Sequence, residues 1–325
     1  MKDIGIAGLP YSGKTTLFHA LTLSGSAGGR SNQAVVDVVD PRLEVLARLE
    51  RSKKIVPAKV RFVDVPGGLT ARGIAEYRQT DALCIVVRAF GADSDPVREL
   101  ASVQDELLLA DLASLESGRD KALKRARGAP EARTEVEVLE RAHAFVDASR
   151  PLRDAELDDD DLKLLRGYAP LTLKPQVVVA NVEEGAAAPA GLDNVIAISA
   201  ALEAEVAGMD FAEALELLQG FGVAERGLER VITYGYRALD LITFLTTGED
   251  ESRAWEVRRG ATAPEAAGQI HSDLERGFIR AEVVSYDDLV AAGSWSKCKE
   301  KGVLKVEGKD YRVKEGDVIS VRFAV

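Results

Sequence analysis

In the stretch Ile4-Gly-Ile-Ala-Gly-Leu-Pro-Tyr-Ser-Gly-Lys-Thr-Thr16 a short apolar segment runs directly into a glycine-rich loop. Glycines let consecutive backbone N–H groups curl around a β-phosphate, while a lysine and a hydroxyl at the loop's end reach the β and γ oxygens and Mg²⁺. The sequence therefore predicts a nucleoside triphosphate site, with these phosphate-binding residues: Gly8, Pro10, Tyr11, Ser12, Gly13, Lys14, Thr15 and Thr16.

The segment after this loop has the pattern of a helix. Leu17, Phe18 and Leu21 recur at helical spacing and predict a helix from Lys14 to about Leu23. The positive end of the helix dipole then faces the phosphates and adds to their attraction.

Length and composition are those of a globular protein of two or three domains. The 325 residues are 46% hydrophobic and 29% charged, with a net charge of −11. No apolar run approaches the roughly 20 residues of a membrane helix, and the N-terminus lacks a signal-peptide pattern, so we expect a cytoplasmic protein without membrane contacts. The acidic balance argues against DNA or diffuse nucleic-acid binding, although it is compatible with a local basic patch. Of two cysteines, Cys84 is expected in the core and Cys298 on the surface.

A second phosphate-site motif follows at the end of a later strand. Residues 59–65 alternate into an apolar strand that ends in Asp64-Val-Pro-Gly67. An aspartate here holds a Mg²⁺-bound water, and the glycine N–H reaches the γ-phosphate. We therefore expect Asp64 and Thr15 to be the metal-site residues and Gly67 to contact phosphate.

Candidate base-binding residues come after two further strands. The strand 176–180 ends in Asn181-Val-Glu-Glu184, where a guanine-binding protein has Asn-Lys-x-Asp, and the strand 194–198 ends in Ser199-Ala-Ala201. Strand ends in this order meet at one edge of a parallel sheet. The expected base contacts are Asn181, Val182, Glu184, Ser199, Ala200 and Ala201.

These residues favour adenine over guanine. Glu184 is one methylene longer than the usual aspartate, and Val182 replaces the lysine that packs along guanine. An asparagine amide such as that of Asn181 complements the N6 donor and N7 acceptor of adenine. ATP is therefore the expected ligand, with GTP as the open alternative.

Residues 97–167 interrupt the strand–helix alternation. Two apolar series at helical spacing, separated by Gly128-Ala-Pro130, predict an antiparallel helical hairpin. Lys121, Lys124, Arg125 and Arg127 cluster at its tip. They fit either contact with RNA or a ribosomal surface, or an ordinary solvated helix face.

The order of these motifs resembles the YchF subfamily of Obg-like P-loop NTPases over nearly the whole chain. The resemblance rests on the phosphate loop and on Asp40-Pro-Arg-Leu43, Glu106–Asp111, Lys174-Pro175, Val179–Glu184 and Ala200–Glu205. It is closest in the C-terminal third, at Leu241–Phe244, Arg253–Trp255, Thr262–Pro264, Ile270-His271, Glu275–Glu282 and Glu307–Tyr311.

This resemblance implies an α/β P-loop NTPase G-domain fold with a helical hairpin insertion and a C-terminal ubiquitin-like α+β (TGS) domain. The expected boundaries are 1–104 and 167–236 for the nucleotide domain, 105–166 for the hairpin and 237–325 for the TGS-like domain. Membership also implies ATP hydrolysis and association with ribosomes or RNA-containing translation machinery.

The chain departs from the family pattern where hydrolysis is controlled. Tyr11 replaces an asparagine that helps to hold a monovalent cation in related enzymes, and no threonine lies between Ser24 and Val63. Ser31 or Asn32 are the candidates to replace that switch threonine, and Gly68 stands where a water-orienting side chain is expected. Two hypotheses follow: a slow ATPase, or a nucleotide-binding interaction module that scarcely turns over.

Overall fold

The computed structural model describes residues 1–27, 32–129 and 132–324. The chain divides into two units, the first formed by Met1–Val36 and Arg61–Ala238 and the second by Asp37–Val60 and Leu239–Val325. Residues 37–60 thus belong with the C-terminal region, whereas the boundaries expected from the sequence place them in the nucleotide domain.

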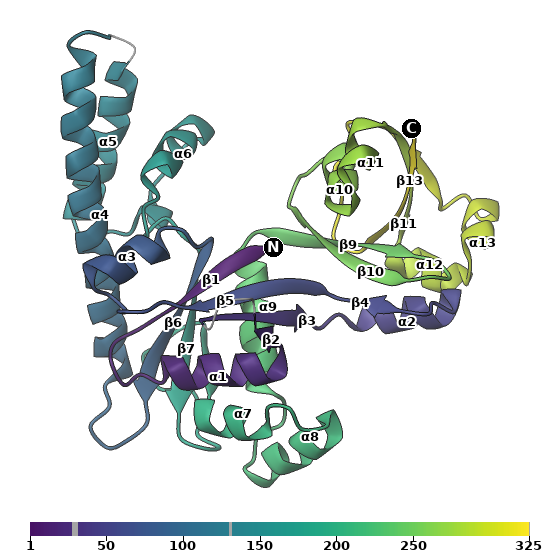
Figure 1. The fold of residues 1–325 in the computed structure, drawn as a ribbon, viewed down its shortest axis with the longest axis horizontal. Coiled ribbons are helices and arrows are strands. Elements are labelled where there is room, and N and C mark those ends of the chain that lie inside the picture. Colours follow the sequence, from purple (N-terminus) through teal and green to yellow (C-terminus); the bar gives the residue numbers. More distant parts are fainter. Residues whose placement is uncertain (28–31, 130–131, 325) are drawn as a thin grey trace. The chain divides into compact units, whose positions relative to one another are not determined.

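A seven-stranded sheet lies at the centre of the first unit, in the order β2-β3-β5-β1-β6-β7-β8 (Figure 1). β6 pairs in parallel with β1 and β7, and β7 with β8. The interior strand β6 is buried over six consecutive residues, as a strand covered on both faces requires. The strands are β1 Lys2–Ala7, β2 Ser26–Ala27, β3 Gln33–Val38, β5 Ala58–Asp64, β6 Ala82–Ala89, β7 Gln176–Val182 and β8 Val195–Ile198.

Helices connect these strands. They are α1 Lys14–Ser24, α3 Ala71–Tyr77, α4 Pro96–Ala126, α5 Arg133–Asp147, α6 Asp159–Leu165, α7 Ala200–Val206, α8 Phe211–Gly220 and α9 Gly227–Ala238, with short 3₁₀ helices at Leu152–Asp154 and Arg166–Tyr168. Because α1 begins directly after the loop that follows β1, and α7 directly after β8, both helix N-termini lie at the carboxyl edge of the sheet.

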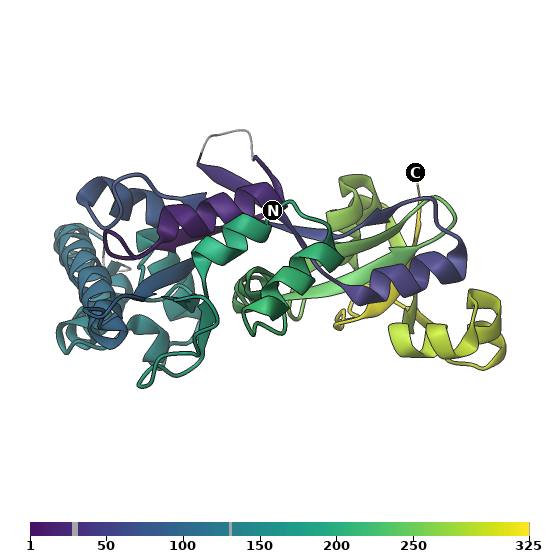
Figure 2. The same ribbon diagram turned by 90° about the horizontal axis from the view of Figure 1, so that it is seen from below.

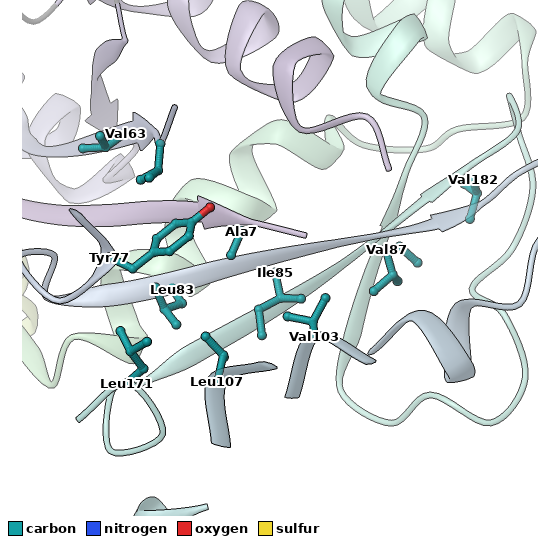
Figure 3. Close-up of a cluster of buried hydrophobic side chains, with 12 residues drawn as sticks. Ala7, Val63, Tyr77, Leu83, Ile85, Val87, Val103, Leu107, Leu171 and Val182 are labelled. Carbon is teal, nitrogen blue, oxygen red and sulfur yellow. The ribbon is translucent and has the colours of Figure 1, made fainter. Parts of the chain in front are cut away.

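The core of the sheet is packed against α3 and the first half of α4 (Figure 3). Leu83 and Ile85 of β6 and Val103 and Leu107 of α4 are fully buried in it. Tyr77 is also fully buried, and its hydroxyl donates to the Ile6 carbonyl at 2.9 Å. This packing fixes β1, and with it the start of the phosphate loop.

The predicted hairpin is present. α4 and α5 run side by side in Figure 1 and are seen nearly end-on in Figure 2. Leu115 of α4 and Leu139 of α5 are fully buried in a separate core between them. α4 is one continuous helix across residues 104–105, so its first half covers the sheet and its second half forms the hairpin.

The second unit contains a sheet in the order β12-β11-β13-β9-β10-β4. β9 and β10 form an antiparallel pair, and β13 lies parallel to β9. α10 packs against these strands, and its Ala263, Ala266 and Ala267 are buried in one hydrophobic core with Ile242 and Phe244 of β9. The elements of this unit are α2 Pro41–Glu50, β4 Ile55–Val56, β9 Leu241–Thr247, β10 Ser252–Arg258, α10 Ala263–Ile270, α11 Ser272–Arg276, β11 Phe278–Ser285, α12 Tyr286–Ala292, α13 Trp295–Glu300, β12 Lys305–Glu307 and β13 Asp317–Phe323.

The cysteine expectation is half right. Cys84 is buried in β6, as expected, but Cys298 is also buried, so its assignment to the surface is wrong. The lysines around Cys298 misled the prediction, because α13 turns Lys297 and Lys299 to solvent and Cys298 inward. Over the described residues, no helix combines the length and apolarity that crossing a membrane requires.

Candidate nucleotide-binding site

The phosphate loop is held in a conformation that only glycine permits at two positions. Gly8 has φ +151°, and a β-carbon there would lie 2.3 Å from the Val86 carbonyl oxygen. Gly13, the N-cap of α1, has φ +95°, and its β-carbon would lie 2.1 Å from Asn181 Nδ2. The loop is therefore closed against β6 on one side and against the end of β7 on the other.

Lys14 is placed inside this loop. Its Nζ donates to the Leu9 carbonyl at 2.6 Å, so the ammonium group bridges the loop. Partial burial lowers the pKa of Lys14, while the carboxylates of Asp64 and Glu99 oppose that shift. An anion with several oxygens would replace the single carbonyl contact and stabilise the charged lysine.

Thr15 and Asp64, the expected metal-site residues, are brought together. The Thr15 hydroxyl lies close to the Asp64 carboxylate, whose pKa is raised by burial and lowered by Lys14 and by Thr15. Within residues 1–27, 32–129 and 132–324, no three His, Cys, Asp or Glu side chains gather as a metal cage. One hydroxyl and one carboxylate still fit Mg²⁺, which uses few protein ligands and completes its shell with phosphate oxygens and water.

The first switch is partly visible. Asn32 Nδ2 donates to the Asp64 carbonyl at 3.2 Å, and the Asn32 carbonyl accepts from the Asp64 N–H at 3.0 Å. Asn32 therefore braces the backbone at Asp64, with its side-chain amide directed there. Ser31, the other candidate for the switch threonine, lies outside the described residues.

A cavity of about 880 Å³ extends from the phosphate loop to the ends of β7 and β8. Its volume is within the range of small-ligand pockets. Its walls come from four strand ends and the start of α1, and consist of Tyr11, Gly13, Lys14, Thr15, Thr16, Arg88, Phe90, Asn181, Val182, Glu183, Glu184, Ser199 and Ala201.

Asn181 joins the two ends of this cavity. It is 7% exposed; its Nδ2 donates to the Ser12 carbonyl at 3.1 Å, and its Oδ1 accepts from the Ala200 N–H at 2.9 Å. An amide has two N–H groups and two oxygen lone pairs. Asn181 is thus a brace between the phosphate loop and the Ser199–Ala201 loop, and these two contacts with described residues leave one N–H and one oxygen lone pair of its amide over.

Six residues expected in the site do not line the cavity. Within the phosphate loop Gly8 and Ser12 are buried and Pro10 is exposed, and Asp64 interacts with Thr15 without lining the cavity itself. Ala200 is buried, with its N–H bound by Asn181. Gly67 lies in the turn after Asp64, where its carbonyl accepts from the Thr70 N–H at 3.2 Å.

Three lining residues are absent from the sequence-based assignment: Arg88, Phe90 and Glu183. Arg88 is the last residue but one of β6, and its backbone N–H donates to Glu99 Oε2 at 2.9 Å. The Gly91 N–H, next to Phe90, donates to Glu183 Oε1 at 3.2 Å and ties the two loops together. Ligands bind at the carboxyl ends of parallel strands, and this rule predicted Asn181 at the end of β7. Applied to the end of β6, it would also have predicted Arg88 and Phe90.

Comparison with known proteins gives the family. Over 99% of both chains, the protein is 39% identical to the "Ribosome-binding ATPase YchF" of Pasteurella multocida strain Pm70 and 38% identical to that of Bacillus subtilis strain 168. This chain belongs to the YchF family. Residues 241–324 match the YchF-GTPase_C family model, described as a protein of unknown function (DUF933).

A YchF structure also resembles the whole chain. The YchF GTPase of Schizosaccharomyces pombe superposes with a TM-score of 0.90 at 29% identity, covering 99% of this chain and 97% of the other. The P-loop NTPase fold predicted from the sequence is thereby confirmed. The alignments with the bacterial YchF proteins extend over 358 and 361 residues against 325 here, so those relatives contain segments that this chain lacks.

Proposed function

We propose that this chain binds ATP with Mg²⁺, hydrolyses it slowly, and uses its nucleotide state to control association with ribosomes. One observation carries the proposal: Lys14 and Thr15, at the N-terminus of α1, line one end of an 880 Å³ cavity, and the Asp64 carboxylate interacts with both of them. The opposite end is formed by the loops after β7 and β8. That arrangement matches a charged triphosphate joined to a planar base.

The phosphate end works through charge and backbone donors. The Lys14 ammonium would leave the Leu9 carbonyl for β and γ oxygens, and the amides of residues 11–15 would surround the β-phosphate. Thr15 and Asp64 would hold Mg²⁺, which supplies charge neutralisation at the phosphates. Gly67 would offer its N–H to the γ-phosphate.

At the base end we propose preference for adenine. Asn181 retains one amide N–H and one lone pair after bracing the loops, which is the pair that N7 and N6 of adenine require. A mispaired buried donor costs about 1–3 kcal/mol, so ATP should bind about ten to a hundredfold more tightly than GTP. Among the relatives, the bacterial YchF proteins are named ATPases and the Schizosaccharomyces pombe YchF is named a GTPase. Direct competition between ATP and GTP tests the preference, and tighter GTP binding would favour a GTPase.

A nucleotide-binding module without useful turnover is the second candidate. No threonine lies between Ser24 and Val63, and the residue after Gly67 is Gly68, so two groups that position an attacking water are replaced. The loss of each group costs about 1–3 kcal/mol of transition-state stabilisation. The two losses together should reduce the turnover rate by about a hundredfold or more. Multiple-turnover phosphate release by the isolated protein should therefore lie far below one per second. Turnover near one per second, abolished in Lys14→Ala, would contradict this.

Ribosome association is proposed from the names of the relatives and from two basic surfaces on an acidic chain. We define the hairpin-tip cluster as Lys121, Lys124 and Arg127, all exposed. We define the α13 cluster as Lys297, Lys299 and Lys301, also exposed. Lys and Arg on a surface attract RNA phosphates in a salt-dependent manner. Work on ribosomes would place the protein in the cytoplasm.

Two matched triple variants test which cluster contacts the ribosome. One variant changes the three residues of the hairpin-tip cluster to glutamate, and the other changes the three residues of the α13 cluster. Because all six side chains are exposed, the folded state and the ATP affinity should be unchanged. Co-sedimentation with ribosomes should fall in at least one variant and show a steep dependence on salt. Undiminished co-sedimentation of both variants would exclude these surfaces as ribosome contacts.

A further inference from the structure

Tyr11 is the most exposed of the large hydrophobic side chains in the described residues, at 91%. Its backbone has φ +66°, in the left-handed region that residues with a β-carbon rarely adopt. Residues held in such conformations cluster where proteins contact ligands. A bulky aromatic ring is thus held in solvent, in a strained backbone, at the mouth of the cavity.

The position of Tyr11 relates it to the base end as well as the phosphate end. It lines the cavity together with Val182. Tyr11 immediately precedes Ser12, whose carbonyl is bound by Asn181 Nδ2, and Val182 immediately follows Asn181. The hydrogen bond between Ser12 and Asn181 therefore brings Tyr11 and Val182 to the same part of the wall.

Phe90 gives the same part of the cavity wall a second aromatic side chain, which suits contact with a flat, apolar ligand group. Phe90 lines the cavity, and its neighbour Gly91 is tied to Glu183 of the base loop at 3.2 Å. Aromatic side chains bind nucleobases by stacking, and every base offers a π-face for this contact. Stacking on these aromatic side chains would therefore raise the affinity for a nucleotide without distinguishing one base from another.

We propose that the Tyr11 side chain closes over the nucleoside of the bound nucleotide and packs on the base. This inference rests on the proposed function of the same cavity and adds a residue role to it. The Tyr11 backbone N–H serves the phosphates, while its ring covers the nucleoside and shields it from solvent. Because stacking is indifferent to base identity, the ring raises the affinity for ATP and GTP equally and leaves selectivity to Asn181.

Tyrosine nitration by tetranitromethane, read by peptide mass spectrometry, tests the closure directly. Exposed Tyr11 should be nitrated rapidly in the free protein and at least about fivefold more slowly with saturating MgATP or MgGTP. Inorganic tripolyphosphate, which lacks a nucleoside, should not protect it. Tyr234 on α9 is the internal control, because it is 50% exposed and does not line the cavity. Unchanged nitration of Tyr11 under conditions where ATP is bound would overturn the inference.

Two variants distinguish the contribution of the Tyr11 ring to nucleotide affinity from the contributions of its hydroxyl and its backbone. Tyr11→Gly removes the ring at a φ that glycine adopts freely, so folding is not impaired, and Tyr11→Phe retains the ring. By calorimetry, Tyr11→Gly should bind ATP and GTP about tenfold more weakly with tripolyphosphate affinity unchanged, and Tyr11→Phe should match the native chain. Equal losses for ATP and tripolyphosphate, or no loss at all, would contradict the ring's role. If the native chain bound no nucleotide, or bound it independently of Lys14, the proposed function itself would fail.

Discussion

Gly13→Ala is the substitution for which the structure predicts the clearest local damage. A β-carbon at Gly13 would lie 2.1 Å from Asn181 Nδ2, and the residue has φ +95°. The backbone conformation costs about 1–2 kcal/mol with alanine. Displacing Asn181 leaves its buried partners at Ser12 and Ala200 unsatisfied, which adds about 1–3 kcal/mol. The free energy of unfolding of the first unit should thus fall by about 2–5 kcal/mol.

Gly208→Ala is the matched control. Gly208 has φ +86°, but no described atom lies within 4 Å of its added β-carbon, so only the backbone cost of about 1–2 kcal/mol applies. Urea denaturation followed by far-UV circular dichroism measures both variants. Trp255 and Trp295, the only two tryptophans, lie in the second unit, so their fluorescence reports that unit separately.

Gly13→Ala should also weaken ATP binding at least tenfold relative to Gly208→Ala, because the loop amides move with Asn181. If Gly13→Ala were as stable as Gly208→Ala and bound ATP equally well, the brace formed by Asn181 would not organise the site.

Three further predictions concern buried polar and thiol groups. Asp111 is fully buried and accepts hydrogen bonds from the Leu171 and Thr172 N–H groups and from Arg78. Asp111→Ala should therefore lower the free energy of unfolding by about 3–5 kcal/mol in urea denaturation. A loss below about 1 kcal/mol would contradict a stabilising role for this buried carboxylate. Burial raises the pKa of Glu203 above its ordinary 4.5, so the folded state retains a proton that the unfolded chain has lost, and stability falls as pH rises through that interval. Glu203→Gln, which still accepts from Gly227, should therefore gain stability over the native chain as pH rises above about 4.5 and show no gain below it; a pH-independent difference would contradict the shift. Burial raises the pKa of Cys84 to about 12 and also raises that of Cys298, so both thiols should resist alkylation at pH 8 until urea unfolds the chain, and labelling of the native protein would refute this.

Elements with a strong local pattern could be predicted from the sequence. The strand expected over 59–65 is β5 Ala58–Asp64, and the helix expected from Lys14 to about Leu23 is α1 Lys14–Ser24. These succeed because apolar periodicity and glycine spacing are local signals. The same signals placed Asn181 and Ser199 at neighbouring strand ends, where both line the cavity.

Long-range pairing had no such local signal. β4 pairs with β10 through Ile55 and Ser252, almost 200 residues apart, and Arg42 forms an ion pair with Glu315 at 2.6 Å. These contacts draw residues 37–60 into the second unit. Composition and periodicity report what a segment buries, whereas its partner is decided by tertiary packing.

The site was predicted less completely than the fold for a similar reason. Asn181 was expected to contact the base, but its hydrogen bonds to Ser12 and Ala200 are visible only once the two loops meet in space. Phe90 lies beyond the end of a strand without any motif of its own. Side chains that line a cavity without a fixed motif become recognisable only in three dimensions.

Calorimetric titration of the native chain and of Lys14→Ala with MgATP tests whether the cavity beside the phosphate loop is the nucleotide site. Lys14 is expected to face the β and γ oxygens of the ligand, so its removal deletes charge-assisted contacts without opening the core. We expect saturable binding to one site in the native chain and at least tenfold weaker binding in the variant, with unchanged thermal unfolding. Equal ATP affinity in the two proteins would contradict the assignment of this cavity as the nucleotide site.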